Sequence, residues 1–152
     1  MKYLFTLLLS VSLLVSCSSD EDETGTPSIV GEWDATSFTT SLSFDLNGDG
    51  QSSNDIIQEL DCYTSTLTFN EDGTFTSFTS DITLEPVGDG TFLGDCEVAP
   101  TVSGTYTLSN AALTTVTGDQ TIESQVQIGN TEMILRGQDQ DFGSLTIIYE
   151  RQ

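Results

Sequence analysis

The sequence contains no histidine and only 3 lysine and arginine residues, against 24 aspartates and glutamates in 152 residues. Without an imidazole there is no histidine general base, no histidine-oriented nucleophile and no histidine-ligated zinc. With a formal net charge of −21, the chain also lacks the cationic surface that binds nucleic-acid backbones. We therefore expect no nucleic-acid partner and no histidine-dependent catalysis.

Carboxylates and tyrosines are the general acids and bases that remain, which makes a two-carboxylate glycosidase the least demanding enzyme. Glu85, Glu97, Glu123 and Glu132 could supply such a pair, but no motif surrounds any of them. Scattered carboxylates on alternating strands normally form a solvated face. We therefore predict that the protein is not an enzyme and has no catalytic residues.

The amino-terminal segment is typical of an exported lipoprotein. A lysine near the start is followed by a mostly apolar run, residues 3–15, which is too short to span a membrane. Leu14–Cys17 resembles the lipobox of bacterial lipoproteins, in which cleavage before the cysteine leaves it as a lipidated first residue. We predict a signal peptide over residues 1–16 and lipidation of Cys17; the alternative is a buried apolar helix with an incidental cysteine.

Residues 17–28 are predicted to be the lipidated cysteine and a flexible stalk, because four consecutive acids at 20–23 cannot contribute to a core. An acidic run in this position is similar to the export signal of surface lipoproteins in the Bacteroidetes; the alternative is a merely solvating tether. The expected location is the cell envelope, with the chain lipid-anchored to the outer membrane and exposed at the cell surface if the run acts as that signal. Cleavage would leave Arg136 and Arg151 as the cations of the chain.

The body, residues 29–152, has the size of one domain and the pattern of an all-β protein. Apolar and polar residues alternate with period two, which indicates strands, and segments rich in Gly, Asn and Asp separate them as hairpin turns. About nine strands are expected, over Glu32–Phe44, Tyr63–Phe69, Thr74–Ser80, Asp81–Val87, Val102–Leu108, Leu113–Thr117, Gln120–Ile128, Thr131–Arg136 and Ser144–Tyr149.

One short helix is predicted after the first loop, over Ser53–Leu60, since Ser53 or Asn54 can cap it and its apolar residues share a face. A meander of short antiparallel strands satisfies its edges by closing into a barrel or by folding into a sandwich. We favour an antiparallel up-and-down barrel of eight to nine strands.

Several segments carry a family resemblance. Gly31–Trp33 resembles the Gly-X-Trp signature that opens lipocalin barrels. Together with Leu67–Phe75, Gly104–Leu108 and Tyr149–Arg151, it makes the body similar to lipocalin-like lipoproteins of the Bacteroidetes. The resemblance implies an eight-stranded barrel whose interior is filled by side chains or holds one small apolar ligand.

The same resemblance implies how the barrel closes. Gly31 and Trp33 would lie at the barrel bottom, with Trp33 packed under a late arginine, which is Arg151 or, as the less favoured match, Arg136. A cation over an indole face contributes roughly 0.5–2 kcal/mol, and the role is structural. The alternative is that Trp33 forms a platform for a ligand.

Cys62 and Cys96 remain once Cys17 is lipidated, and an even number of cysteines in an exported chain favours a disulfide. Two free thiols are the alternative. A redox-active pair is disfavoured, because the spacing lacks a Cys-X-X-Cys motif and neither cysteine has a cationic neighbour in the sequence.

Residues 45–55 match the first half of a calcium loop, D-x-[DN]-x-[DN]-G. Ile56 stands where such a loop has its bidentate Glu, so the last acid comes one place early; dockerin repeats are similar in their start and in the acid that opens a short helix. The alternative is a metal-free loop whose Asx side chains cap the backbone. The expected calcium ligands are Asp45, Asn47, Asp49, Gln51 and Asp55.

These observations predict a membrane-anchored lipoprotein whose barrel binds a small apolar or amphipathic ligand at the cell envelope, with calcium at the first loop. The ligand-binding residues stay unassigned. The alternative is a non-catalytic interaction or structural module with a filled barrel, which contacts a protein or glycan partner. A small barrel could be filled by large rings such as Phe69, Phe75, Tyr106 and Tyr149. The volume of the interior therefore distinguishes the ligand-binding barrel from the filled module.

Overall fold

The computed structural model describes residues 27–88, 91–139 and 142–152, so the predicted signal peptide, Cys17 and the acidic run lie outside the described residues. The regular secondary structure of the described chain is almost entirely β-strand, as expected. Its elements are β1 (Gly31–Phe44), β2 (Ser53–Asp55), α1 (Ile56–Glu59), β3 (Ser65–Phe69), β4 (Thr74–Thr79), β5 (Asp81–Gly88), β6 (Thr91–Glu97), β7 (Val102–Ser109), β8 (Ala112–Thr117), β9 (Gln120–Ile128), β10 (Glu132–Asp139) and β11 (Gly143–Arg151).

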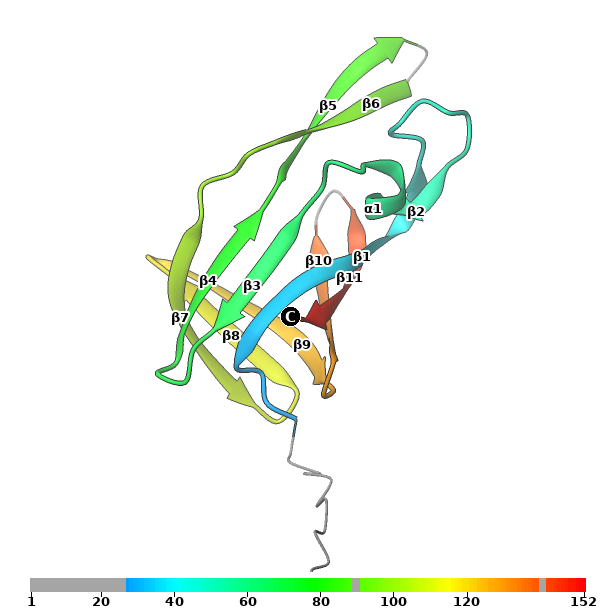
Figure 1. The fold of residues 1–152 in the computed structure, drawn as a ribbon. Coiled ribbons are helices and arrows are strands. Elements are labelled where there is room, and N and C mark those ends of the chain that lie inside the picture. Colours follow the sequence, from blue (N-terminus) through cyan, green and yellow to red (C-terminus); the bar gives the residue numbers. More distant parts are fainter. Residues whose placement is uncertain (1–26, 89–90, 140–141) are drawn as a thin grey trace, which may run out of the picture.

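Eight of the described strands close into an antiparallel barrel, in the order β1, β3, β4, β7, β8, β9, β10 and β11 (Figure 1). The last strand pairs back with the first, from Trp33 opposite Arg151 to Thr40 opposite Leu145. This closure leaves the barrel without the free edges of an open sheet. The predicted all-β class and up-and-down barrel are confirmed.

The region of the predicted helix, Ser53–Leu60, differs from expectation. Residues Ser53–Asp55 form β2, which pairs with β1, and α1 covers only Ile56–Glu59. Asp55 is the N-cap instead of Ser53 or Asn54, because its carboxylate accepts the Ile57 N–H at 3.1 Å. No helix within the described ranges is long and apolar enough to cross a membrane.

Strands β5 and β6 pair with each other and form a separate two-stranded ribbon that extends beyond the barrel (Figure 1). β4 consequently pairs with β7, the strand after the ribbon. The sequence pattern predicted β5 but missed β6, because the adjacent apolar residues Phe92 and Leu93 interrupt the alternation that marks a half-buried strand. The ribbon and β2 together account for the described strands that the barrel does not contain.

Two apolar clusters fill parts of the interior. The first surrounds Trp33 and includes Phe69 and Met133, all of them at 2% exposure or less. The second lies under α1 and consists of Phe38, Leu46, Ile56, Leu60 and Tyr63. In Figure 1 the start of β1 and α1 lie toward opposite ends of the barrel. The clusters therefore occupy different parts of the interior.

A disulfide joins Cys62, which follows α1, to Cys96 on β6, with the two Cα atoms 5.8 Å apart. The predicted pairing is confirmed. The Gly94 N–H also donates to the Leu46 carbonyl at 2.9 Å, and a Cβ on Gly94 would lie about 3 Å from Leu46 and Leu60. The bridge and this close contact hold the base of the ribbon against the second cluster.

Replacing both cysteines, Cys62→Ser with Cys96→Ser, is expected to lower the free energy of unfolding by about 4 kcal/mol, because the bridge closes a loop of sequence separation 34. Chemical denaturation of the variant and of the wild type measures this difference. Reduced wild-type protein is the control and should unfold at the midpoint of the double variant. Equal midpoints for oxidised wild type and variant would contradict the expectation.

Candidate functional site

One end of the barrel is sealed by a pairing of Trp33 with Arg151. Trp33 is fully buried, and its indole N–H donates to the Ile29 carbonyl at 2.8 Å. The Arg151 guanidinium carbon lies 4.0 Å from the centroid of the Trp33 ring, within the range of a cation–π contact. Arg151, and not Arg136, is the arginine over the indole.

The Arg151 guanidinium also holds three chain segments together at this sealed end. It donates to the carbonyls of Ser28, Val30 at 2.7 Å and Asn130 at 2.8 Å. Gly31 is required beside it, since its φ is +134° and a Cβ there would lie 2.6 Å from Arg151 Nη1. The Gly-X-Trp signature therefore combines a ring that fills the barrel end with a glycine that admits the arginine.

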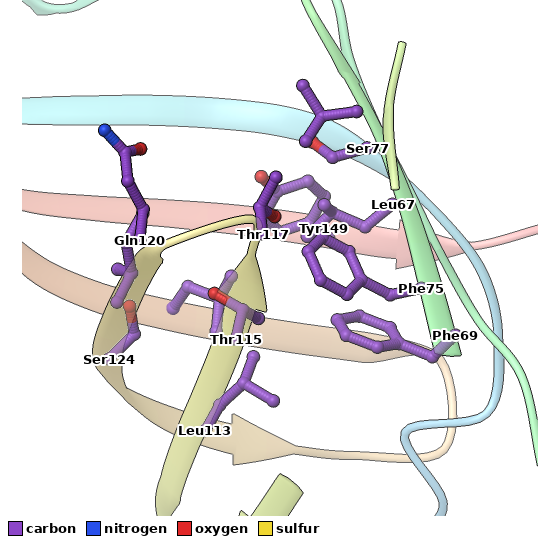
Figure 2. A pocket seen from close by; sticks show the side chains of 13 residues that line it. Leu67, Phe69, Phe75, Ser77, Leu113, Thr115, Thr117, Gln120, Ser124 and Tyr149 are labelled. Carbon is purple, nitrogen blue, oxygen red and sulfur yellow. The ribbon is translucent and has the colours of Figure 1, made fainter. Parts of the chain in front are cut away.

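The barrel interior contains a cavity of about 390 Å³, which we call the calyx. Figure 2 shows Phe69 and Phe75 on one side of it and Gln120 and Ser124 on the other. The apolar side adjoins the first cluster, while the polar residues lie near the turn between β8 and β9. The lining comprises Leu67, Phe69, Phe75, Ser77, Val102, Leu113, Thr115, Thr117, Gln120, Ile122, Ser124, Leu135 and Tyr149.

No aspartate, glutamate, lysine or arginine occurs in this lining, although the chain has 24 acidic residues. The polar groups are hydroxyls and one amide, of which Thr115, Thr117 and Ser124 come from the β8–β9 hairpin. A mainly apolar pocket with a few placed polar groups is the usual form of a small-molecule site. The calyx thus suits an apolar molecule with hydrogen-bonding groups at one end.

Tyr149 is the most buried polar residue of the calyx lining. Its side chain is 3% exposed, and its hydroxyl shares a hydrogen bond with Ser65 Oγ at 3.2 Å, which in turn contacts Thr79 Oγ1 at 3.0 Å. Burial raises the pKa of the Tyr149 phenol above its usual value, so the hydroxyl stays protonated at neutral pH. The calyx wall therefore remains uncharged there.

The first loop holds its own backbone with its polar side chains. The Asp45 carboxylate accepts the N–H of Gly48 at 2.9 Å and of Gly50 at 3.0 Å. Asn47 accepts the Asp49 N–H at 2.9 Å, and Asp49 accepts the Gln51 N–H at 2.7 Å. These are the Asx turns that the metal-free alternative predicts, and they leave further oxygen lone pairs on the same side chains.

Asp55, the last predicted calcium ligand, serves another purpose in the fold. It is 8% exposed, and its two oxygens accept from Ser37 Oγ at 2.8 Å, the Phe38 N–H at 3.0 Å and the Ile57 N–H. Within the ranges that the structure describes, no group of three His, Cys, Asp or Glu side chains is arranged to hold a metal ion. Calcium binding at this loop stays a prediction.

Sequence reasoning left the calyx residues unassigned. Ser77, Thr115, Thr117, Gln120 and Ser124 lie in turn-rich, polar stretches and resemble an outer strand face. The available signal was that residues two apart share a face, counted from Phe75 on β4, Leu113 on β8 and Val126 on β9, which are all buried. The four glutamates considered for catalysis are all exposed and line no part of the calyx.

An antiparallel barrel with one sealed end, a mainly apolar cavity and a mouth that carries hydroxyls near the β8–β9 turn defines a calyx-type binding barrel. The chain belongs to the lipocalin-like domain family, because the family model described as "Lipocalin-like domain" matches residues 29–135. The matched range ends within β10, so β11, which ends at Arg151, lies beyond it. No curated protein matches the chain.

Arg151→Met is expected to lower the free energy of unfolding by about 3 kcal/mol, because the cation–π contact and three charged hydrogen bonds to backbone carbonyls are lost together. Arg136→Met is the matched control. It removes the same charge from an exposed side chain and should change stability by less than about 0.5 kcal/mol. Denaturant titration measures both, and equal losses would show that net charge alone is responsible.

If the first loop binds calcium, the ion must raise the unfolding midpoint, since it binds the native state. The expected gain is about 2.7 kcal/mol at a calcium concentration one hundred times the Kd. Thermal unfolding of the protein with calcium and with chelator measures it. Asp45→Asn is the control, because the amide oxygen retains an acceptor for the loop N–H groups but removes a ligand charge. Identical midpoints in calcium and in chelator would show that the loop does not bind calcium.

Proposed function

We propose that this protein is a non-catalytic binding lipoprotein that holds a small apolar or amphipathic molecule in its calyx at the cell envelope. The observation that carries the proposal is the open cavity of about 390 Å³, with aromatic rings toward the sealed end and hydroxyls, beside the aliphatic Val102 and Ile122, toward the mouth. Membership of the lipocalin-like domain family supports a binding barrel.

The distribution of side-chain size explains why the cavity stays open. Phe69, Phe75 and Tyr106 pack together at the sealed end, with Phe69 4.9 Å from Tyr106 and 6.2 Å from Phe75 between ring centroids. The lining nearer the mouth consists of Thr115, Thr117 and other non-aromatic residues, so no ring fills the remaining space there. This arrangement favours the ligand-binding hypothesis over a barrel filled by its own side chains.

The barrel has a sealed end and an open mouth, and their positions relative to the stalk determine how the anchored protein would be oriented. Ile29 contacts Trp33 at the sealed end, so a stalk that leads from a lipidated Cys17 reaches the barrel at that end. The calyx mouth would then point away from the membrane of attachment. In this arrangement the protein receives its ligand from the surrounding medium or from a partner, and the anchor of several acyl chains holds it in the outer membrane.

Thr115→Trp is expected to abolish ligand binding, because an indole at this inward position of β8 occupies the calyx. Thr114→Trp is the matched control, since the neighbouring residue lines no part of the calyx and points to the other face of the strand. Native mass spectrometry with methyl laurate as the probe measures binding to both variants. Equal binding to the two variants would contradict the assignment of the calyx.

Native mass spectrometry of the lipoprotein, gently extracted from its own membrane, tests the proposal as a whole. Mass beyond the lipid anchor that is absent from Thr115→Trp and present in Thr114→Trp would support a ligand carried in the calyx. Bare protein that also fails to take up methyl laurate would favour the interaction module. In that module the exposed apolar side chains of the ribbon, Leu84, Val87 and Phe92, would face a partner.

A further inference from the structure

The barrel wall separates between β9 and β10. β9 pairs with β8 along the whole length of β8, and β10 pairs with β11 from Glu132 to Asp139. β9 and β10, however, pair only as far as Arg136 opposite Gln125. The rest of β10, from Gly137, and the first half of β9, up to Ser124, therefore have no β-ladder between them. In a closed barrel every strand normally pairs on both sides, so this interruption opens the wall.

A second cavity of about 690 Å³ lies at this interruption, and we call it the slot. Its lining includes outward-facing residues such as Gln125, Arg136 and Gln138, together with Ser124 and Gly137. Ser124 also lines the calyx, so the two cavities share a wall residue. The slot thus adjoins the apolar interior from the side of the barrel and not from its mouth.

Gly137 keeps the inner side of the slot open. It alternates with Leu135, which lines the calyx, and a Cβ at Gly137 would meet no heavy atom within 4 Å. Its φ is not positive, so the backbone does not require glycine at this position. Any larger residue would place its side chain in the open space, whereas glycine leaves room for a chain of methylene groups.

Arg136 provides the charge of the slot. Its side chain is exposed, and it makes no hydrogen bond or ion pair with any part of the chain that the structure describes. Glu123 is the carboxylate that lines the same slot, and it forms no ion pair with Arg136. Arg151, in contrast, uses its guanidinium N–H groups in hydrogen bonds to backbone carbonyls at the sealed end. The Arg136 guanidinium is therefore available to a carboxylate, which it can bind with two parallel hydrogen bonds.

The charge of the whole chain makes this contact selective. A protein of net charge −21 repels anions at long range, so an anionic ligand needs a direct cationic contact in order to bind. Gln125 and Gln138, one on each side of the slot, add amide donors that a carboxylate also accepts. The calyx lining itself offers no cation.

We propose that the slot between β9 and β10 is a headgroup site, at which Arg136 binds the carboxylate of an amphipathic ligand while the apolar chain passes Gly137 and Ser124 into the calyx. This inference rests on the proposed function of the calyx and names its ligand class as amphipathic carboxylates. The ligand lies across the wall of the barrel, with its head outside and its tail inside.

Competition between laurate and methyl laurate tests the headgroup site, because the two probes share one chain and differ in charge. Equal amounts of both are added to the extracted lipoprotein, and native mass spectrometry gives the ratio of bound laurate to bound methyl laurate. Arg136→Gln is expected to lower this ratio about tenfold or more, the effect of losing a charged hydrogen bond. The ratio cancels any difference in the folded fraction between variants.

Ser103→Glu is the matched control, since it makes the same change of net charge at an exposed residue of β7 that lines neither cavity. It should leave the ratio unchanged. Gly137→Leu should lower the ratio as Arg136→Gln does, because it closes the passage to Arg136 while methyl laurate still enters through the mouth.

Three outcomes would overturn the headgroup site. The first is that the ratio of bound laurate to bound methyl laurate stays the same in Arg136→Gln, and the second is that it falls equally in Ser103→Glu. The third is that the wild type binds methyl laurate but not laurate. In each case methyl laurate still binds, so the calyx proposal survives. If the wild type binds neither probe, the calyx proposal fails together with the headgroup site.

Discussion

The pairing of β1 with β11 closes the barrel and thereby positions both the sealed end and the cavity. When β11 pairs with β1, the sheet loses its free edges, and Trp33 comes to lie opposite Arg151. The same closure brings Ser28, Val30 and Asn130 within reach of one guanidinium. The sealed end is thus a product of closure. The backbone pairing of neighbouring strands holds the barrel wall in place, so a cavity can exist beside the sealed end without side chains that fill it.

The interior is divided between packing and open space. The cluster under α1 fills one part, and the rings around Trp33 fill the sealed end, while small hydroxyl side chains border the calyx near the mouth. Acidic residues are absent from the calyx lining although they dominate the composition. An uncharged interior within a strongly acidic chain favours apolar tails, and it leaves the recognition of a charged head to the wall, where Arg136 lies.

The strands could largely be predicted from the sequence, because alternation with period two reports directly which residues share a face. The short helix was placed too early, since Asp55 bonds to β1 and caps α1, and a local pattern cannot show a partner that lies 17 residues earlier. The first loop illustrates the same limit. Its Asp and Asn oxygens satisfy backbone N–H groups, and residue types and spacing do not distinguish that use from a metal shell.

The class of fold follows from the sequence, and so do most of the strand segments, the disulfide partners and the signature of the sealed end. These follow from local periodicity, from the number of cysteines and from one short motif. Only the folded chain shows that β5 and β6 leave the barrel, that the calyx is open, and that the wall separates beside Arg136. Ladder pairing and cavity volume depend on contacts between residues far apart in the chain, which no local pattern contains.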